Sequence, residues 1–259
     1  MGGNGHRYRW ILRTAVLLAL TGPAVLARLP VDYRVEVGYG GMVGQNGRIV
    51  PVTVTIDNKV AGTAGLIELS QPDPSGQGEV RQLLPIVTPA PSVKRFVMLA
   101  RLEPNRDLRL NIEFEDSLRA IHKTITPQRV GQPLVLRVGA LSSYPLGKIA
   151  EKYRFVSVES AAIPAEPLAL DGVHAVMLTG AAFGLLSGEQ LEALRQWAST
   201  GGGVILMDGI PGEEALRKRW AAFAGDQAPL LEQGGLSAFG AGWLAAPGPN
   251  AVPSRPFWE

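Results

Sequence analysis

The sequence predicts two domains, an all-β sandwich followed by an α/β domain, behind a short apolar N-terminal segment. Apolar residues recur at every second position from residue 31 to about 127. From residue 133 onward, predicted strands and helices alternate, and the strands are apolar almost without interruption. The first pattern is typical of antiparallel strands with one solvated face, and the second of a parallel sheet covered on both faces. The predicted boundaries are 1–27 for the N-terminal segment, 31–129 for the sandwich and 133–259 for the α/β domain.

The first 27 residues have the pattern of a secretory signal peptide. Three arginines precede the apolar stretch 15–27, in which Val25 and Ala27 occupy the small-residue positions of a cleavage site. A retained membrane anchor is the alternative, because the stretch 10–29 approaches the ~20 residues that span a bilayer. A Gly-Pro pair interrupts this stretch and favours cleavage. In both cases we expect the rest of the chain to lie outside the cytoplasm, either secreted or tethered to a membrane.

Charge and cysteine content exclude several classes of function. The chain has 25 Lys+Arg and 23 Asp+Glu, and without the three arginines of the first 27 residues 22 basic residues face 23 acidic ones. The basic character therefore belongs to the N-terminus, and we expect no nucleic-acid partner. The chain contains no cysteine. Disulfides, thiolate metal ligands and a cysteine nucleophile are thereby excluded.

Six segments make up the predicted sandwich. Three of them, at 31–39, 50–57 and 108–116, alternate clearly between apolar and polar residues. The other three, at 65–70, 80–87 and 93–102, are shorter apolar runs. Short strands at this spacing predict an immunoglobulin-like sandwich in general form, without the Cys-Trp-Cys pattern of antibody domains.

The glycine-rich stretch 37–48 lies between the first two of these strands. It lacks the Gly-Lys-Ser/Thr ending of a phosphate-binding loop, and no helical pattern follows it. We interpret it as a long hairpin loop, of the kind that can carry ligand recognition.

The α/β domain is predicted from strands and helices in alternation, which implies βαβ crossovers and a flavodoxin-like layout. The expected strands are 134–141, 155–158, 174–180 and 204–209, the expected helices are 145–153, 187–200 and 213–225, and a strand or hairpin closes the domain at 236–246. The stretch 126–133 is the expected linker.

The helix at 187–200 is the best marked of these elements. Ser187 is a favourable N-cap, Gln190 completes a capping box, and Leu186 with Leu191 forms a hydrophobic staple. Gly201 provides the C-terminal stop. In the helix at 213–225, we expect the basic run 217–219 to face solvent, with contact to an anionic membrane surface as the alternative.

Three stretches together resemble a known family: GVHAVMLTG at 172–180, LSGEQLEALRQWASTGGGVILMDG at 186–209 and GAGWLAAPGPN at 240–250. They are similar to the class I glutamine amidotransferase-like domains of bacterial envelope proteins. In those proteins the domain often follows a β-sandwich and precedes transmembrane helices, which implies membrane association. No such span is visible up to Glu259, so the sequence leaves open whether a membrane segment follows.

The resemblance also implies where a nucleophile would lie. Members of the superfamily carry a cysteine on a strand-to-helix elbow, with a histidine and an acid later in the chain. The corresponding elbow here is Asp208-Gly209-Ile210, and no histidine follows His174. Glutaminase activity is therefore not expected.

Asp208 and His174 are the two candidate catalytic residues. Asp208 follows a predicted strand, where it can accept a hydrogen bond or bind a cation, or else close a turn with Gly209. His174 precedes a strand and can pair with Ser142, Ser143 or Ser187, or else mark the strand boundary. Three histidines, one of them in the N-terminal segment, predict no zinc site. We expect no cofactor.

Three functions remain open. The leading hypothesis is a non-catalytic, exported or membrane-associated module that binds or assembles cell-envelope components, with envelope proteins or a cell-wall polymer as partners. The second is a hydrolase that uses Asp208 or a serine at the carboxyl edge of the α/β sheet. The third is a carbohydrate- or peptidoglycan-binding role for the sandwich.

Overall fold

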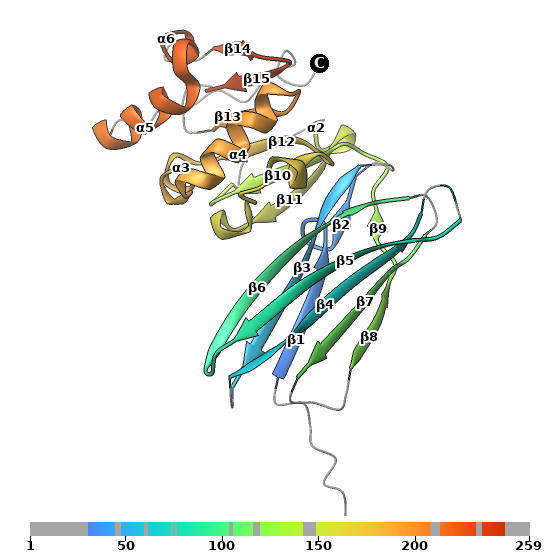
Figure 1. Cartoon of the computed structure of the whole chain (residues 1–259). Coiled ribbons are helices and arrows are strands. Elements are labelled where there is room, and N and C mark those ends of the chain that lie inside the picture. Colours follow the sequence, from blue (N-terminus) through green and yellow to red (C-terminus); the bar gives the residue numbers. More distant parts are fainter. Residues whose placement is uncertain are drawn as a thin grey trace, which may run out of the picture.

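The computed structural model of the chain is rich in β-strands, as the sequence predicts (Figure 1). The residues it describes are 31–44, 48–59, 62–73, 75, 77–103, 106–115, 120–141, 149–207, 213–231 and 235–246. The predicted signal segment 1–27, Ser142, Ser143 and Asp208 lie outside these described residues. We refer to residues 31–130 as the N-terminal part and to residues 133–246 as the C-terminal part.

The N-terminal part is built from two antiparallel sheets. One has the strand order β1-β3-β6 and the other β5-β4-β7-β8. Their bounds are β1 Val31–Val37, β3 Ile49–Asn58, β6 Ser92–Arg101, β5 Glu79–Thr88, β4 Thr63–Pro72, β7 Leu108–Phe114 and β8 Ile121–Ile125.

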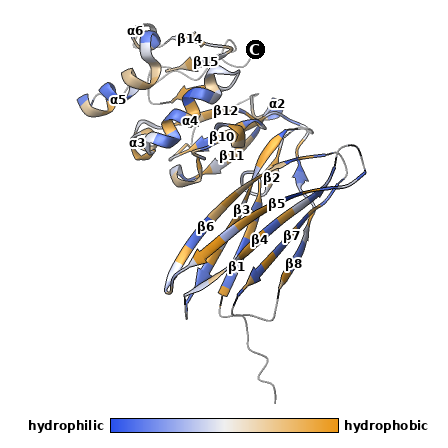
Figure 2. Cartoon of the chain, in the orientation of Figure 1, coloured by the Kyte–Doolittle hydropathy of each residue, from blue (hydrophilic) through white to orange (hydrophobic). Residues whose placement is uncertain are grey.

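Alternation of side chains explains why the two sheets pack against each other. Val52, Val54 and Ile56 of β3 are fully buried and share one hydrophobic cluster with Ile67 and Leu69 of β4. The intervening polar residues point outward, so the strands change between hydrophobic and hydrophilic along their length (Figure 2). Each sheet thus covers the apolar face of the other and keeps one polar face.

The C-terminal part contains a six-stranded sheet in the order β11-β10-β12-β13-β15-β14. Its strands are β11 Arg154–Val158, β10 Leu134–Val138, β12 Val173–Leu178, β13 Gly203–Leu206, β15 Gly242–Ala245 and β14 Leu236–Phe239. Neighbouring strands pair in parallel except β14, which runs antiparallel to β15.

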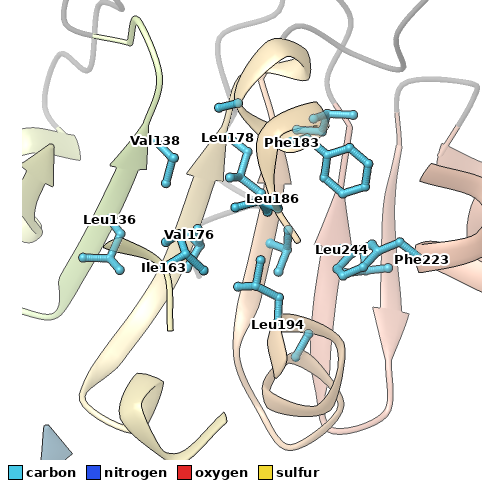
Figure 3. Packing of buried hydrophobic residues seen from close by; sticks show 14 of the residues in the cluster. Leu136, Val138, Ile163, Val176, Leu178, Phe183, Leu186, Leu194, Phe223 and Leu244 are labelled. Atoms are coloured by element: carbon cyan, nitrogen blue, oxygen red, sulfur yellow. The ribbon is translucent and has the colours of Figure 1, made fainter. Parts of the chain in front are cut away.

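Three helices cover one face of this sheet: α3 (Gly180–Leu185), α4 (Gly188–Ser199) and α5 (Glu214–Ala224). Their apolar side chains, including Phe183, Leu194 and Phe223, pack on alternate strand residues (Figure 3). The remaining strand residues, such as Val135 and Met177, are equally buried and belong to a cluster on the opposite face. Burial on both faces is why these strands are apolar at nearly every position.

The predicted caps of α4 are present. The Ser187 hydroxyl accepts a hydrogen bond from the Gln190 backbone N–H at 3.1 Å, and the Gln190 side chain accepts one from the Ser187 N–H at 2.8 Å. Helix α3 is not among the predicted elements. It begins at Thr179, whose hydroxyl accepts from the Ala182 N–H at 3.1 Å. Two of its six residues are glycines, so this short segment shows no clear helical period in the sequence.

Two predicted features differ in detail. The strand expected at 134–141 ends at Val138, because Gly139 turns the backbone with φ of +94°. The basic run of α5 is not uniformly solvated, since Arg219 donates to the Gly184 and Leu186 carbonyls at the C-terminal end of α3. Only Arg217 and Lys218 of that run are exposed.

Short elements complete the chain: β2 (Met42–Val43), β9 (Gln128–Arg129), α2 (Ile149–Lys152), η1 (Ser160–Ala162), η2 (Pro167–Leu170), η3 (Gly225–Gln227) and α6 (Ala228–Leu231). Strand β9 falls within the predicted linker and pairs in parallel with β2. The connection between the two parts is therefore tied to the N-terminal part by strand pairing. Among the described residues, no helix combines the length and the apolar character that crossing a membrane requires.

Candidate interdomain binding groove

The two parts are joined by the glycine-rich turn after β1. Gly38, Gly40 and Gly41 have positive φ angles of 72°, 59° and 74°, which other residues rarely adopt. This backbone directs Tyr39 into the hydrophobic cluster of the C-terminal part, where 4% of it remains exposed. Its hydroxyl donates to the Ala169 carbonyl at 3.0 Å, and burial raises the pKa of Tyr39 well above its usual value. Tyr39 thus anchors the turn of the N-terminal part in the hydrophobic core of the C-terminal part, and we call this buried side chain the Tyr39 plug.

Asp171 makes the second connection. Its carboxylate accepts hydrogen bonds from the Ile49 N–H at 2.9 Å and from the Arg48 guanidinium at 3.0 Å. Beside it the two backbones approach closely, since a Cβ on Gly44 would lie 2.6 Å from the Gly172 carbonyl oxygen. We call the Tyr39 plug and the Asp171 contacts together the seam.

A groove of about 460 Å³ lies next to the seam and is lined by both parts. The N-terminal part contributes the outer face of the β1-β3-β6 sheet, and the C-terminal part contributes the carboxyl end of β11 with η1. Arg34, Glu36, Thr53, Thr55 and Arg95 come from the sheet. Ser157 and Glu159 face them from the other side.

Arg95 holds the two walls of the groove together. Its guanidinium donates to the Ala161 carbonyl of η1 at 2.9 Å and to the Thr53 hydroxyl at 3.4 Å. Arg95 and Ala161 also line a second hollow of about 280 Å³, which continues past Val97 toward Ser187. The groove therefore has a polar half and a more apolar half that meet at Arg95.

The remaining groups in the polar half are hydrogen-bonding groups at the surface. Arg34 pairs with Glu36 at 3.4 Å, and the other Glu36 oxygen accepts from the Gly40 N–H at 2.8 Å. The Ser157 hydroxyl accepts from Arg137 at 3.1 Å. Guanidinium, carboxylate and hydroxyl groups alternate along the groove, which suits a ligand that itself has both donors and acceptors.

The candidate His174 lies away from this groove, at the amino end of β12. Its ring is 5.2 Å from that of Tyr153, and burial lowers its pKa below the usual value. Strand β13 ends at Leu206, in register with Leu178 of β12. Leu178 is four residues beyond His174, or ~13 Å along the strand. His174 is therefore remote from the carboxyl edge of the sheet, and its distance from Asp208 lies outside what the described residues show.

Ser187 has a structural role, and His174 lies near the seam. The Ser187 hydroxyl is occupied as the N-cap of α4, and His174 borders a hollow of about 130 Å³ beside Arg48 and Asp171. Among the described residues, no three His, Asp or Glu side chains are grouped as they would be around a metal ion.

The residues of the groove were not identified as site residues from the sequence. Arg34, Thr55 and Arg95 occupy outward positions of alternating strands, where a polar side chain is the ordinary choice. The sequence gives no sign of which polar sheet face meets the C-terminal part.

A second polar hollow, of about 330 Å³, lies on the outer face of the other sheet. Glu79 is its central acid and pairs with Arg109 at 2.7 Å and with Arg81 at 3.4 Å. His122 and Thr124 of β8 line the same hollow. This hollow contains side chains of the N-terminal part alone.

Comparison with known proteins assigns no family. No protein-family model matches the chain, and no curated protein matches it in sequence. Among solved structures, it is similar to CsgH of R. palustris at 14% identity, over 38% of this chain and 93% of that one, with a TM-score of 0.26. A family 123 glycoside hydrolase from Clostridium perfringens aligns at 7% identity, over 78% of this chain and 57% of that one, with a TM-score of 0.28. Likenesses this weak carry no argument about fold or function.

Proposed function

We propose that the protein is a non-catalytic, exported module that binds or assembles components of the bacterial cell envelope, and that the interdomain groove holds its ligand. The observation that carries the proposal is the composition of the groove, to which both parts contribute hydrogen-bonding side chains. The predicted signal segment or anchor supports an extracytoplasmic, secreted or membrane-tethered location.

The proposal includes a finer description of the fold. The order β11-β10-β12-β13 supports a flavodoxin-like sheet, and the sequence resemblance supports an amidotransferase-like domain that lacks the nucleophile. The two sheets around one core support an immunoglobulin-like sandwich before it. In this proposal the α/β domain has no catalytic role and contributes one wall of a binding groove.

Binding suits the groove better than catalysis because three of its charged groups, Arg34, Glu36 and Arg95, are already engaged with partners within the protein. Arg95 bonds to η1 and to Thr53, and Glu36 bonds to Gly40 and Arg34. A general base or nucleophile needs a free, activated atom facing the substrate. The partner we expect is an envelope protein segment or a cell-wall polymer with exposed amide and hydroxyl groups.

The test is site-specific photo-cross-linking in living cells. A photo-reactive amino acid replaces Thr55 or Ser157 in the groove, Thr124 on the other sheet, or the exposed Lys218 of α5 as a control. We expect covalent adducts from the groove positions alone, and mass spectrometry separates peptide from glycan adducts. Arg34→Glu should reduce the yield severalfold, while Asp208→Asn leaves it unchanged. Equal yields at Lys218 and Thr55 would contradict the proposal.

A carbohydrate-binding role for the N-terminal part is the second candidate. The hollow around Glu79 favours it, because Arg, Asn and carboxylate groups there present planar hydrogen-bonding groups on a sheet face. Adducts with glycan at Thr124, and none at Thr55, would favour this function. The hydrolase hypothesis makes the opposite prediction for Asp208→Asn. This variant would abolish turnover, so uncleaved substrate would accumulate and the cross-linking yield would change.

A further inference from the structure

Exposed aliphatic side chains lie along β5 and β6, and those nearest the turn between the two strands form one corner of the N-terminal part. Leu83 and Val87 of β5 are 61% and 64% exposed, and Val93 and Val97 of β6 are 68% and 45% exposed. The two strands follow one another through a turn at residues 89–91, so Val87 and Val93 lie on either side of it. Pro89 and Pro91 in that turn are also exposed. We call Val87, Pro89, Pro91 and Val93 the apolar tip.

Pairing with a further β-strand does not explain the exposed side chains at this corner. Strands β5 and β6 each have one unpaired edge, and such edges often accept a further strand. Here each edge is partly capped by a side chain of the other strand. Lys94 donates to the Val87 carbonyl at 3.0 Å, and Gln82 donates to the Leu99 carbonyl. The corner therefore presents its side chains and not a free backbone.

The apolar tip lies at the end of the N-terminal part where the chain enters it. Val31, the first residue of β1, pairs with Asn58, and Asn58 pairs with Ser92 at the start of β6. The Asn58 amide also donates to the Thr88 carbonyl at 2.9 Å. The seam is at the other end of these strands (Figure 1). The apolar sequence 10–29 thus connects to the molecule beside the tip.

We propose that the apolar tip rests in the surface of a lipid bilayer, next to a retained N-terminal apolar segment. The proposal rests on the membrane-associated form of the function proposed above. Each aliphatic side chain transferred from water contributes about 1 kcal/mol, which is too little to hold a free protein at a membrane. The predicted apolar segment ends two residues before Val31, and such a covalent tether at the same end of the molecule would make this weak contact intramolecular and effective.

A protein partner fits the tip less well. The tip has no aromatic residue and no arginine, which are the residues that usually dominate binding energy between proteins. Its four small side chains are well below the roughly 800 Å² that each partner buries in a stable interface. This area also argues against a second copy of the chain.

Lipid charge is expected to matter little. At this end of the N-terminal part, Asp32, Asp57, Lys59 and Lys94 lie on or beside β1, β3 and β6, and Glu113 and Glu115 lie at the end of β7. Lys59 lies 2.6 Å from Asp32 and 3.4 Å from Asp57, and these residues together carry no excess of positive charge that would attract anionic lipid. The contact is apolar in this proposal, and it should form on zwitterionic and anionic bilayers alike.

The absence of native cysteine allows a direct test in the full chain. Val87→Cys or Val93→Cys is labelled with a polarity-sensitive fluorophore and reconstituted into phosphatidylcholine vesicles. The matched control is Gln77→Cys, in the turn between β4 and β5 at the opposite end of the sheet. We expect a blue-shifted emission at the tip and quenching by shallow nitroxide lipids several times stronger than at the control.

The possible outcomes test membrane contact by the tip separately from membrane association of the whole protein. Flotation with the vesicles, combined with equal quenching at residues 87 and 77, would overturn the tip proposal and leave membrane association intact. Failure of every labelled form to float would overturn both. A blue shift that grows with protein concentration without lipid would assign the tip to self-association and overturn the proposal, as would a response that requires phosphatidylglycerol. Val87→Asp with Val93→Asp should abolish the quenching difference without lowering the Tm.

Discussion

The seam and the groove lie side by side between the same two parts of the chain, yet they are built in opposite ways. In the seam, Tyr39 is buried in a foreign hydrophobic cluster and Asp171 accepts two hydrogen bonds from the other part. In the groove, Arg34 is 80% exposed and the hydroxyl of Ser157 lies at the surface. The seam joins the two parts through a buried side chain and hydrogen bonds, whereas the groove beside it leaves polar side chains at the surface.

The largest expected effect is that of Tyr39→Ala. Removing a buried aromatic side chain from the cluster should lower the free energy of unfolding by about 3 kcal/mol or more. Urea denaturation followed by fluorescence and circular dichroism measures it. Tyr33→Ala is the control, because Tyr33, on the strand β1 that leads into the turn, is 40% exposed and its loss should cost under about 1 kcal/mol. Equal losses for the two variants would show that the plug does not stabilise the seam.

The plug also marks the limit of what the sequence predicts. The sequence predicts a hairpin loop that can carry recognition in the glycine-rich stretch, and the structure has a turn there. It does not predict that Tyr39 in this turn contacts Ala169, 130 positions away. Periodicity reports which face of a strand is apolar and gives no information on such a distant contact. The buried partner of Tyr39 is thus a product of tertiary packing.

Helix α4 shows the converse case. The sequence predicts its N-cap and capping box, because both depend on residues within one turn, and the structure contains both. The strands of both parts follow from local alternation or continuous apolar character in the same way. The groove depends on the apposition of two polar surfaces, so its residues were missed.

Asp171→Ala tests the polar half of the seam. It removes the acceptor of the Ile49 N–H and the partner of Arg48, and we expect a loss of about 1–2 kcal/mol in unfolding free energy. Side chains of Arg48 and Asp171 are 53% and 31% exposed, so solvent screens the ion pair. A double-mutant cycle with Arg48→Ala should therefore give a coupling below about 1 kcal/mol. A coupling equal to the whole loss would mean that the Ile49 hydrogen bond contributes nothing.

His174 makes the stability of the folded protein depend modestly on pH. Burial lowers its folded pKa below the 6.5 of the unfolded chain. The unfolded state then binds more protons than the folded state as pH falls through 6.5, so stability is complete above this pH and decreases below it. His174→Gln should flatten this part of the stability–pH curve measured by urea denaturation. The control His122→Gln, on the outer face of the other sheet, should retain it.

The smallest effect on stability is expected in the groove, for Arg34→Ala. The side chain is 80% exposed and its partner Glu36 keeps a hydrogen bond from Gly40, so the loss in unfolding free energy should stay within about 0.5 kcal/mol. If the groove is a binding surface, the same variant reduces cross-linking at Thr55 although folding is unchanged. Arg34→Lys retains the charge but not the planar guanidinium, so it should restore binding only in part. A destabilisation comparable to that of Asp171→Ala would mean that Arg34 serves to hold the two parts together and is not free to bind a ligand.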